Sequence, residues 1–115
     1  MDDIVIDRAV YAALQDTAGA DFVAELVDTF LQEAPGLLEE LKRALAEGDA
    51  DAFRRAAHSL KSNSNTFGAQ KLAALARELE INGLDPDPAC GLTAHTTLEA
   101  EYERAAARLR ELRNG

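Results

Sequence analysis

The sequence has few of the features that mark a secreted, disulfide-bonded or membrane-bound protein. Cys90 is the only cysteine, which excludes a disulfide within the chain and is compatible with a reducing compartment. No apolar run approaches the roughly 18 residues that a membrane-spanning helix needs. No basic stretch precedes an apolar one at the N-terminus. We therefore expect no signal peptide, no membrane contact and a cytoplasmic location, with Cys90 an incidental loop residue.

Basic residues are also scarce. The chain has 12 Lys and Arg against 21 Asp and Glu, which gives a formal net charge of −9. Proteins that bind nucleic acids depend on positive charge to replace the counterions of the phosphate backbone. This charge balance argues against DNA or RNA as a partner.

Aromatic residues make up only 5% of the chain, and tryptophan is absent. Ala, Leu, Glu and Arg dominate instead, and this composition favours helices. A length of 115 residues suits one domain over residues 1–115, without internal repeats. Nothing in it suggests an obligatory oligomer, so we expect a monomer.

Apolar residues recur with the helical period along most of the chain. A short helix is expected from Asp7 to Gly19. A longer segment from Asp21 to Gly48 is expected to form one helix, kinked at Pro35, rather than two, because its apolar period continues across the proline. Asp49 begins the next helix, and a fourth apolar stripe ends near Gly83.

The stretch 83–92 contains two prolines and two glycines and is expected to form a loop that includes Cys90. A last helix should begin at about Thr96, which places His95 at its start as a cap or a solvated residue. Glycine at position 68 marks a turn between the third and fourth expected helices. The fold class is therefore all-α, an antiparallel four-helix bundle with a short additional N-terminal helix.

The helix expected after Asp49 carries the most informative residue, His58. At about 100° per residue, Ala56, Ala57, Leu60 and Ser64 lie within about 60° of Phe53, and this direction faces the core. His58 lies about 140° from Phe53 and should be exposed. Its neighbours on the polar side of the helix are Arg54, Arg55, Lys61, Ser62 and Asn65.

The surroundings of His58 are locally basic. Residues 52–77 contain five Lys or Arg and no Asp or Glu. A neutral imidazole is a competent nucleophile near pH 7, and a phosphoryl group placed on it would add up to about two negative charges. Lys61, one turn away, is positioned to donate a charge-assisted hydrogen bond to a phosphoryl oxygen. Geometry alone also fits an ordinary solvated helix face.

The string AHSLKSNSNTFGAQKLAALARELE, residues 57–80, resembles the signature HxLKGSSxxxGA of histidine-containing phosphotransfer (HPt) domains. His58 corresponds to the phosphorylated histidine, Lys61 to the lysine beside the phosphoryl group, and Gly68 to the later glycine. Spaced leucines and Glu80 correspond to the helix that follows. Ser62 and Asn63 stand where the family usually has Gly and Ser, a difference that bears on partner choice or transfer rate.

The resemblance implies a phosphocarrier rather than an enzyme. Such domains carry a phosphoryl group between receiver domains of response regulators and hybrid sensor histidine kinases in two-component phosphorelays. The Mg²⁺ ion belongs to the receiver domain, so no cofactor and no metal site are expected in this chain. The sequence contains no glycine-rich phosphate cradle, so ATP binding is not expected.

Two other functions remain open from the residues. One is a helical adaptor or inhibitor that docks on a response regulator without being phosphorylated. The other is a hydrolytic enzyme with His58 as general base, which would need a carboxylate to orient the imidazole. Residues 52–77 offer no such carboxylate, and this is the reason to rank the hydrolase last.

Overall fold

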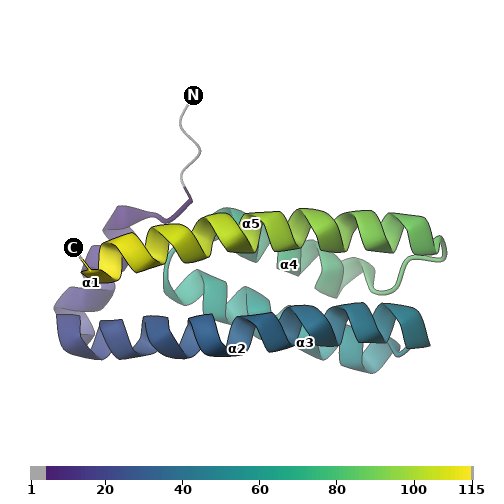
Figure 1. The fold of residues 1–115 in the computed structure, drawn as a ribbon, viewed down its shortest axis with the longest axis horizontal. Coiled ribbons are helices and arrows are strands. Elements are labelled where there is room, and N and C mark those ends of the chain that lie inside the picture. Colours follow the sequence, from purple (N-terminus) through teal and green to yellow (C-terminus); the bar gives the residue numbers. More distant parts are fainter. Residues whose placement is uncertain (1–4, 115) are drawn as a thin grey trace.

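The computed structural model describes residues 5–114, apart from the side chain of Pro88. It contains five helices over these residues: α1 (Arg8–Ala18), α2 (Ala20–Glu47), α3 (Ala50–Thr66), α4 (Gln70–Asn82) and α5 (Pro88–Asn114). Helices α2 to α5 form an antiparallel bundle in which each packs on the next and α5 closes the ring against α2 (Figure 1). The expected fold class is confirmed.

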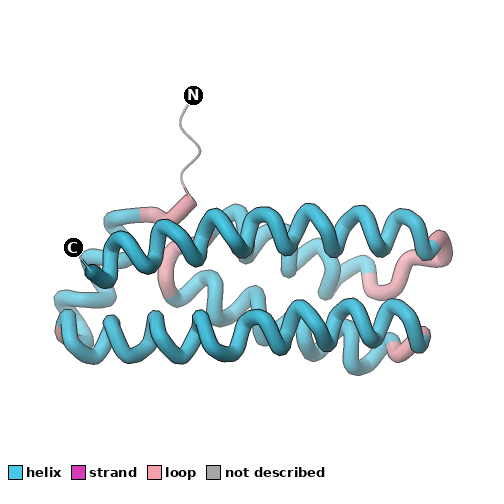
Figure 2. Tube along the Cα trace, in the orientation of Figure 1, coloured by secondary structure: helices cyan, strands magenta, loops and turns pink. Residues whose placement is uncertain are grey.

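The core is aliphatic, with a small aromatic cluster. Phe30 of α2 contacts Phe67, with ring centroids 5.4 Å apart, and Tyr102 of α5, with centroids 5.9 Å apart. The seam expected on the last helix is buried at Leu98, Tyr102, Ala105 and Leu109. Among the described residues, loops occur before α1 and between successive helices, as Figure 2 shows.

Helix α2 runs unbroken through Pro35, as predicted. Proline lacks the N–H that would bond the carbonyl four residues earlier. Pro35 is exposed, while Ala34 and Leu38 beside it are buried. The missing hydrogen bond therefore falls on the solvent side, and the core-facing stripe keeps its phase.

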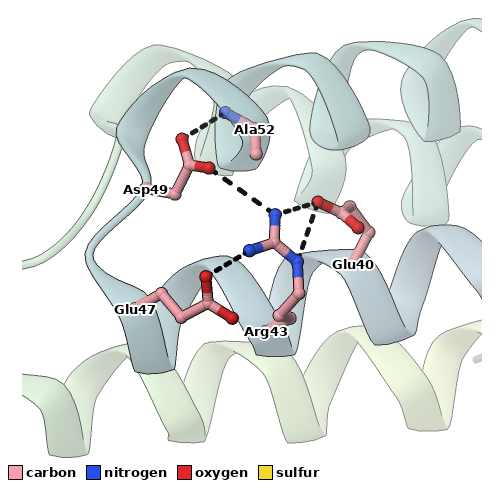
Figure 3. A network of polar contacts seen from close by, with 5 residues as sticks. All are labelled: Glu40, Arg43, Glu47, Asp49 and Ala52. Carbon is pink, nitrogen blue, oxygen red and sulfur yellow. Dashed lines mark hydrogen bonds and ion pairs between the residues drawn. The ribbon is translucent and has the colours of Figure 1, made fainter.

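An ion-pair network joins the end of α2 to the start of α3 (Figure 3). Arg43 hydrogen-bonds Glu40 and Glu47 on its own helix and lies 3.6 Å from Asp49. Asp49 also accepts a hydrogen bond from the backbone N–H of Ala52 and thereby caps α3. That backbone bond, followed by Arg43, lowers the pKa of Asp49, and Arg43 lowers the pKa of Glu40. The network sets the direction in which α3 leaves the turn.

The expected start of the last helix is wrong. Helix α5 begins at Pro88, because proline fits the first helical position, where its missing N–H has no partner to lose. The Asp87 carboxylate accepts a hydrogen bond from the Ala89 N–H, as an N-cap does. A Cβ on Gly91 would lie 2.8 Å from a methyl of Leu45, so this glycine permits close packing instead of breaking the helix. The loop is limited to residues 83–87.

Candidate functional site

Helix α3 presents His58 to solvent, as its periodicity predicts. Phe53, Ala56, Ala57 and Leu60 are buried on the opposite side. The side chain of His58 is 58% exposed. The hydrophobic face of α3 therefore fixes the helix against the bundle and leaves the imidazole accessible to a partner.

Glu80 of α4 holds both polar residues of the signature. One carboxylate oxygen, Oε2, lies 2.7 Å from Nδ1 of His58. The other, Oε1, accepts a hydrogen bond from Nζ of Lys61, also at 2.7 Å. Glu80 and Lys61 are largely covered, with side chains 21% and 24% exposed. The three side chains form a chain of contacts between α3 and α4.

This contact determines which nitrogen of His58 is free. The hydrogen bond from Lys61, and then that from His58, lower the pKa of Glu80, so its carboxyl group is ionised at neutral pH. A carboxylate can only accept hydrogen bonds, so Nδ1 of His58 must be the donor. The neutral ring then carries its lone pair on Nε2. The geometry thus leaves Nε2 as the ring nitrogen without a hydrogen bond to Glu80.

Residues 52–77 contain no carboxylate to orient His58, but one from outside this segment does lie within reach. Glu80 follows the segment 52–77 and returns to His58 because α3 and α4 form an antiparallel hairpin. Leu72, Ala76 and Glu80 recur every four residues, so one stripe of α4 carries all three toward α3. That spacing is the feature of the sequence from which the position of Glu80 beside α3 could have been predicted. The stated ground for ranking a hydrolase last does not hold.

The other two predicted cations lie elsewhere on α3. Arg54 donates a hydrogen bond to Asp51 at 2.8 Å, one turn earlier on the same helix. Arg55 is exposed and faces the groove between α2 and α3 near Glu40. Lys61 is paired with Glu80. Two of these three positive charges are thus partnered within the chain, and the basic patch is weaker than its sequence suggests.

A groove adjoins His58 between α2 and α3, with a volume of about 600 Å³. Its α2 wall includes Glu33, Gly36 and Leu37. Its α3 wall is formed by His58, Ser59, Ser62 and Asn63. The predicted residue Ser62 therefore lies at the site, whereas Glu33, Ser59 and Asn63 were not predicted. Small residues on both walls leave the hollow open beside the imidazole.

Asn65 and Gly68 lie further along the chain. Asn65 is exposed in the last turn of α3, seven residues or about 10 Å along the axis from His58. Gly68 forms the turn, as predicted, with a φ of 76°. Its carbonyl accepts a hydrogen bond from the Asp7 N–H at 2.8 Å. Gly68 therefore fastens the segment before α1 and lies past the end of α3, whose last residue, Thr66, is about 12 Å along the axis from His58.

The expectations for His95 and Cys90 are wrong in their placement. His95 is two turns inside α5 and only 4% exposed, and its Nε2 lies 2.7 Å from the carbonyl oxygen of Leu38. It is a structural residue of the core. Cys90 is exposed in the first turn of α5 rather than in a loop. Within residues 5–114, no three His, Cys, Asp or Glu side chains are grouped so that they could hold a metal ion.

Comparison with known proteins gives a consistent result. Residues 25–111 match the Hpt domain family. The chain is 38% identical over 61 residues to histidine-containing phosphotransfer protein 1 of Oryza sativa subsp. japonica. That match covers 51% of this chain and 42% of the rice protein, so the chain corresponds to less than half of that relative.

The fold matches the crystal structure of histidine-containing phosphotransfer protein B (HptB) from Pseudomonas aeruginosa PAO1. The TM-score is 0.84 at 30% sequence identity, with 98% of this chain and 97% of the other covered. The fold and the exposed histidine on α3 define a class of helical bundles with a histidine on their surface. The chain belongs to the Hpt domain family. None of the helices within residues 5–114 has the length and apolar content needed to cross a membrane.

Proposed function

We propose that this chain is a phosphocarrier in which Nε2 of His58 accepts a phosphoryl group from the aspartyl phosphate of one receiver domain and passes it to the aspartate of another. In the first step the P–O bond to the donor aspartate breaks and a P–N bond forms at Nε2. The aspartate leaves as a carboxylate. The second step reverses this exchange on the acceptor receiver.

The observation that carries this proposal is the 2.7 Å contact between Nδ1 of His58 and the Glu80 carboxylate. It keeps the proton on Nδ1 and the lone pair on Nε2, the condition for nucleophilic attack. As Nε2 bonds to phosphorus, the ring gains positive charge, and the nearby carboxylate stabilises that charge. Glu80 therefore orients the ring and offsets the charge that develops on it.

Lys61 contributes the opposite charge. Its ammonium group shares the Glu80 carboxylate with His58, so it stays close to the imidazole. A phosphoryl group brings up to about two negative charges to the ring. We infer that Lys61 turns from Glu80 to a phosphoryl oxygen, with a charge-assisted hydrogen bond as the gain. Of the two contacts that Glu80 makes, only the one with Lys61 thus changes partner during the transfer.

The partners follow from the same chemistry. The family's role implies receiver domains of response regulators and a hybrid sensor histidine kinase, and the Mg²⁺ ion is expected on the receiver. The chain itself would need no cofactor, bind no ATP and act as a carrier rather than as an enzyme. We place it in the cytoplasm, as a monomer, without nucleic-acid or membrane contacts.

The test is transfer from a receiver domain phosphorylated with ³²P. Wild-type protein should gain acid-labile, alkali-stable label, and His58→Gln should gain none. His95→Gln is the matched control, because His95 is buried and should not react, so this variant should label like the wild type. Label that persists in His58→Gln would contradict the proposal. Equal receiver binding by wild type and His58→Ala, with no label on either, would instead establish the docking adaptor.

A further inference from the structure

The groove beside His58 contains a carboxylate with no partner among residues 5–114. Glu33 lines the groove from α2 and is exposed. Neither a hydrogen bond nor an ion pair joins it to another described residue. The neighbouring acids differ from it, since Glu40 is bound by Arg43 and Glu80 by Lys61. The available charge at this end of the groove is therefore negative.

The other end of the groove carries an arginine beside Glu40. A second hollow of about 290 Å³ shares Leu37 and Ser59 with the first and continues it along α3 to Arg55. Arg55 is exposed and forms no hydrogen bond or close ion pair with a described residue, although its charge helps to lower the pKa of Glu40 and of Asp49 nearby. Asn63 of α3 lines two hollows together with Glu33 and therefore marks the position of Glu33 along α3. Arg55 and Asn63 are eight residues apart, which corresponds to about 12 Å along the helix axis. The continuous groove thus has an unpaired carboxylate near one end and the guanidinium of Arg55 near the other.

A phosphoryl donor that reaches Nε2 of His58 must cover this groove, because His58 forms part of its wall. Covering an unpaired carboxylate removes its water, and the loss is offset only if the partner provides a cation. The same holds, with opposite sign, for the guanidinium of Arg55. A partner with the wrong order of charges would meet like charges at both ends.

We propose, building on the phosphocarrier function, that Glu33 and Arg55 select and orient the receiver domain. The receiver that fits presents a Lys or Arg side chain to Glu33 and an Asp or Glu side chain to Arg55. The two charges lie about 12 Å apart on its docking surface. Neither residue takes part in the chemistry at Nε2. They act on the association of the two proteins, because they favour a receiver domain that docks in the orientation needed for transfer.

The experiment compares Glu33→Lys and Arg55→Glu with wild type in transfer from phosphorylated receiver domains encoded in the same genome. The second-order rate constant should fall about five- to tenfold for each variant, as expected for like charges at an interface. Glu39→Lys and Arg77→Glu are matched controls, since both residues are exposed and outside the groove. Both controls should transfer within twofold of wild type.

Two further measurements separate the possible failures. Phosphoramidate, a small donor that needs no docking surface, should label His58 equally in wild type and in all four variants. A receiver in which the Lys or Arg that faces Glu33 is changed to Glu should recover transfer with Glu33→Lys. Unchanged receiver rates in Glu33→Lys and Arg55→Glu would overturn this inference alone, as would equal losses in the controls. Transfer to wild type from no receiver would overturn the proposed function and this inference with it.

Discussion

Glu80 and His58 are 22 residues apart in the sequence, yet the carboxylate of one lies 2.7 Å from Nδ1 of the other. The contact links α4 to α3 and sets the tautomer of the ring. Lys61 shares the same carboxylate, so the position of one acid determines both the nucleophile and its neighbouring cation. The first three predictions concern this cluster.

Glu80→Gln should weaken the preference for the Nδ1–H tautomer. A glutamine amide both donates and accepts, so it can bond either form of the ring, whereas a carboxylate accepts from Nδ1–H alone. ¹⁵N NMR of the neutral ring should show one tautomer in wild type and a mixture in the variant. Transfer from a receiver should slow about tenfold. Glu78→Gln, exposed on the same helix, should change neither property; an unmixed Nδ1–H tautomer in Glu80→Gln would refute the role given to Glu80.

Acid should remove the stabilisation that Glu80 provides. The pKa of Glu80 is lowered in the folded protein from its ordinary value of 4.5, so the unfolded chain binds the proton more readily. The contribution of ionised Glu80 to the free energy of unfolding is therefore complete above pH 4.5. It is lost as the pH falls through the lower pKa of the folded protein. Urea unfolding of wild type and Glu80→Gln should differ most near pH 6 and converge at lower pH. A gap that widens on acidification would show the opposite sign of linkage.

Lys61→Gln should slow the acceptance of phosphoryl groups by about tenfold, because a charge-assisted hydrogen bond to the transferred group is lost. Phosphoramidate labelling should slow as well, since Lys61 acts at the ring and not on the docking surface. Lys42→Gln removes an exposed lysine on α2 and serves as the control. Equal rates for Lys61→Gln and wild type would leave Lys61 with only its structural contact to Glu80.

Gly68→Ala should destabilise the fold far more than Gly48→Ala. Both glycines have positive φ, 76° and 70°, so each substitution costs about 1–2 kcal/mol of backbone strain. A Cβ at position 68 would also lie 2.9 Å from Cβ of Val10 and 3.0 Å from the Asp7 carbonyl oxygen, while position 48 is open. We expect a loss of about 3 kcal/mol or more for Gly68→Ala in chemical denaturation. Equal losses would show that the segment before α1 moves aside freely.

The bundle could be predicted because its helices follow simple local rules. Asp7 and Asp49 cap helices with their carboxylates, and Gly48 ends α2 in a left-handed conformation. The start of α5 was missed for a physical reason. Pro88 and Gly91 are loop-like residues in general, but one occupies the first turn of a helix and the other contacts Leu45. The packing of Gly91 against Leu45 is known only once α2 has been placed beside α5.

Periodicity alone determined that His58 faces solvent, because a helix with Phe53 and Leu60 against a core must point residue 58 outward. It could not determine the charge state of the surroundings. Counted along the chain, residues near His58 are basic; in space, Glu80 neutralises Lys61, and Asp51 pairs with Arg54.

Electrostatic interactions depend on distance in space, and the α3–α4 turn brings together charges that the sequence separates. The amino-acid order thus specified the helices and the outward ring. The packing of α4 and α2 against α3 decided which nitrogen reacts and which charges remain for a partner.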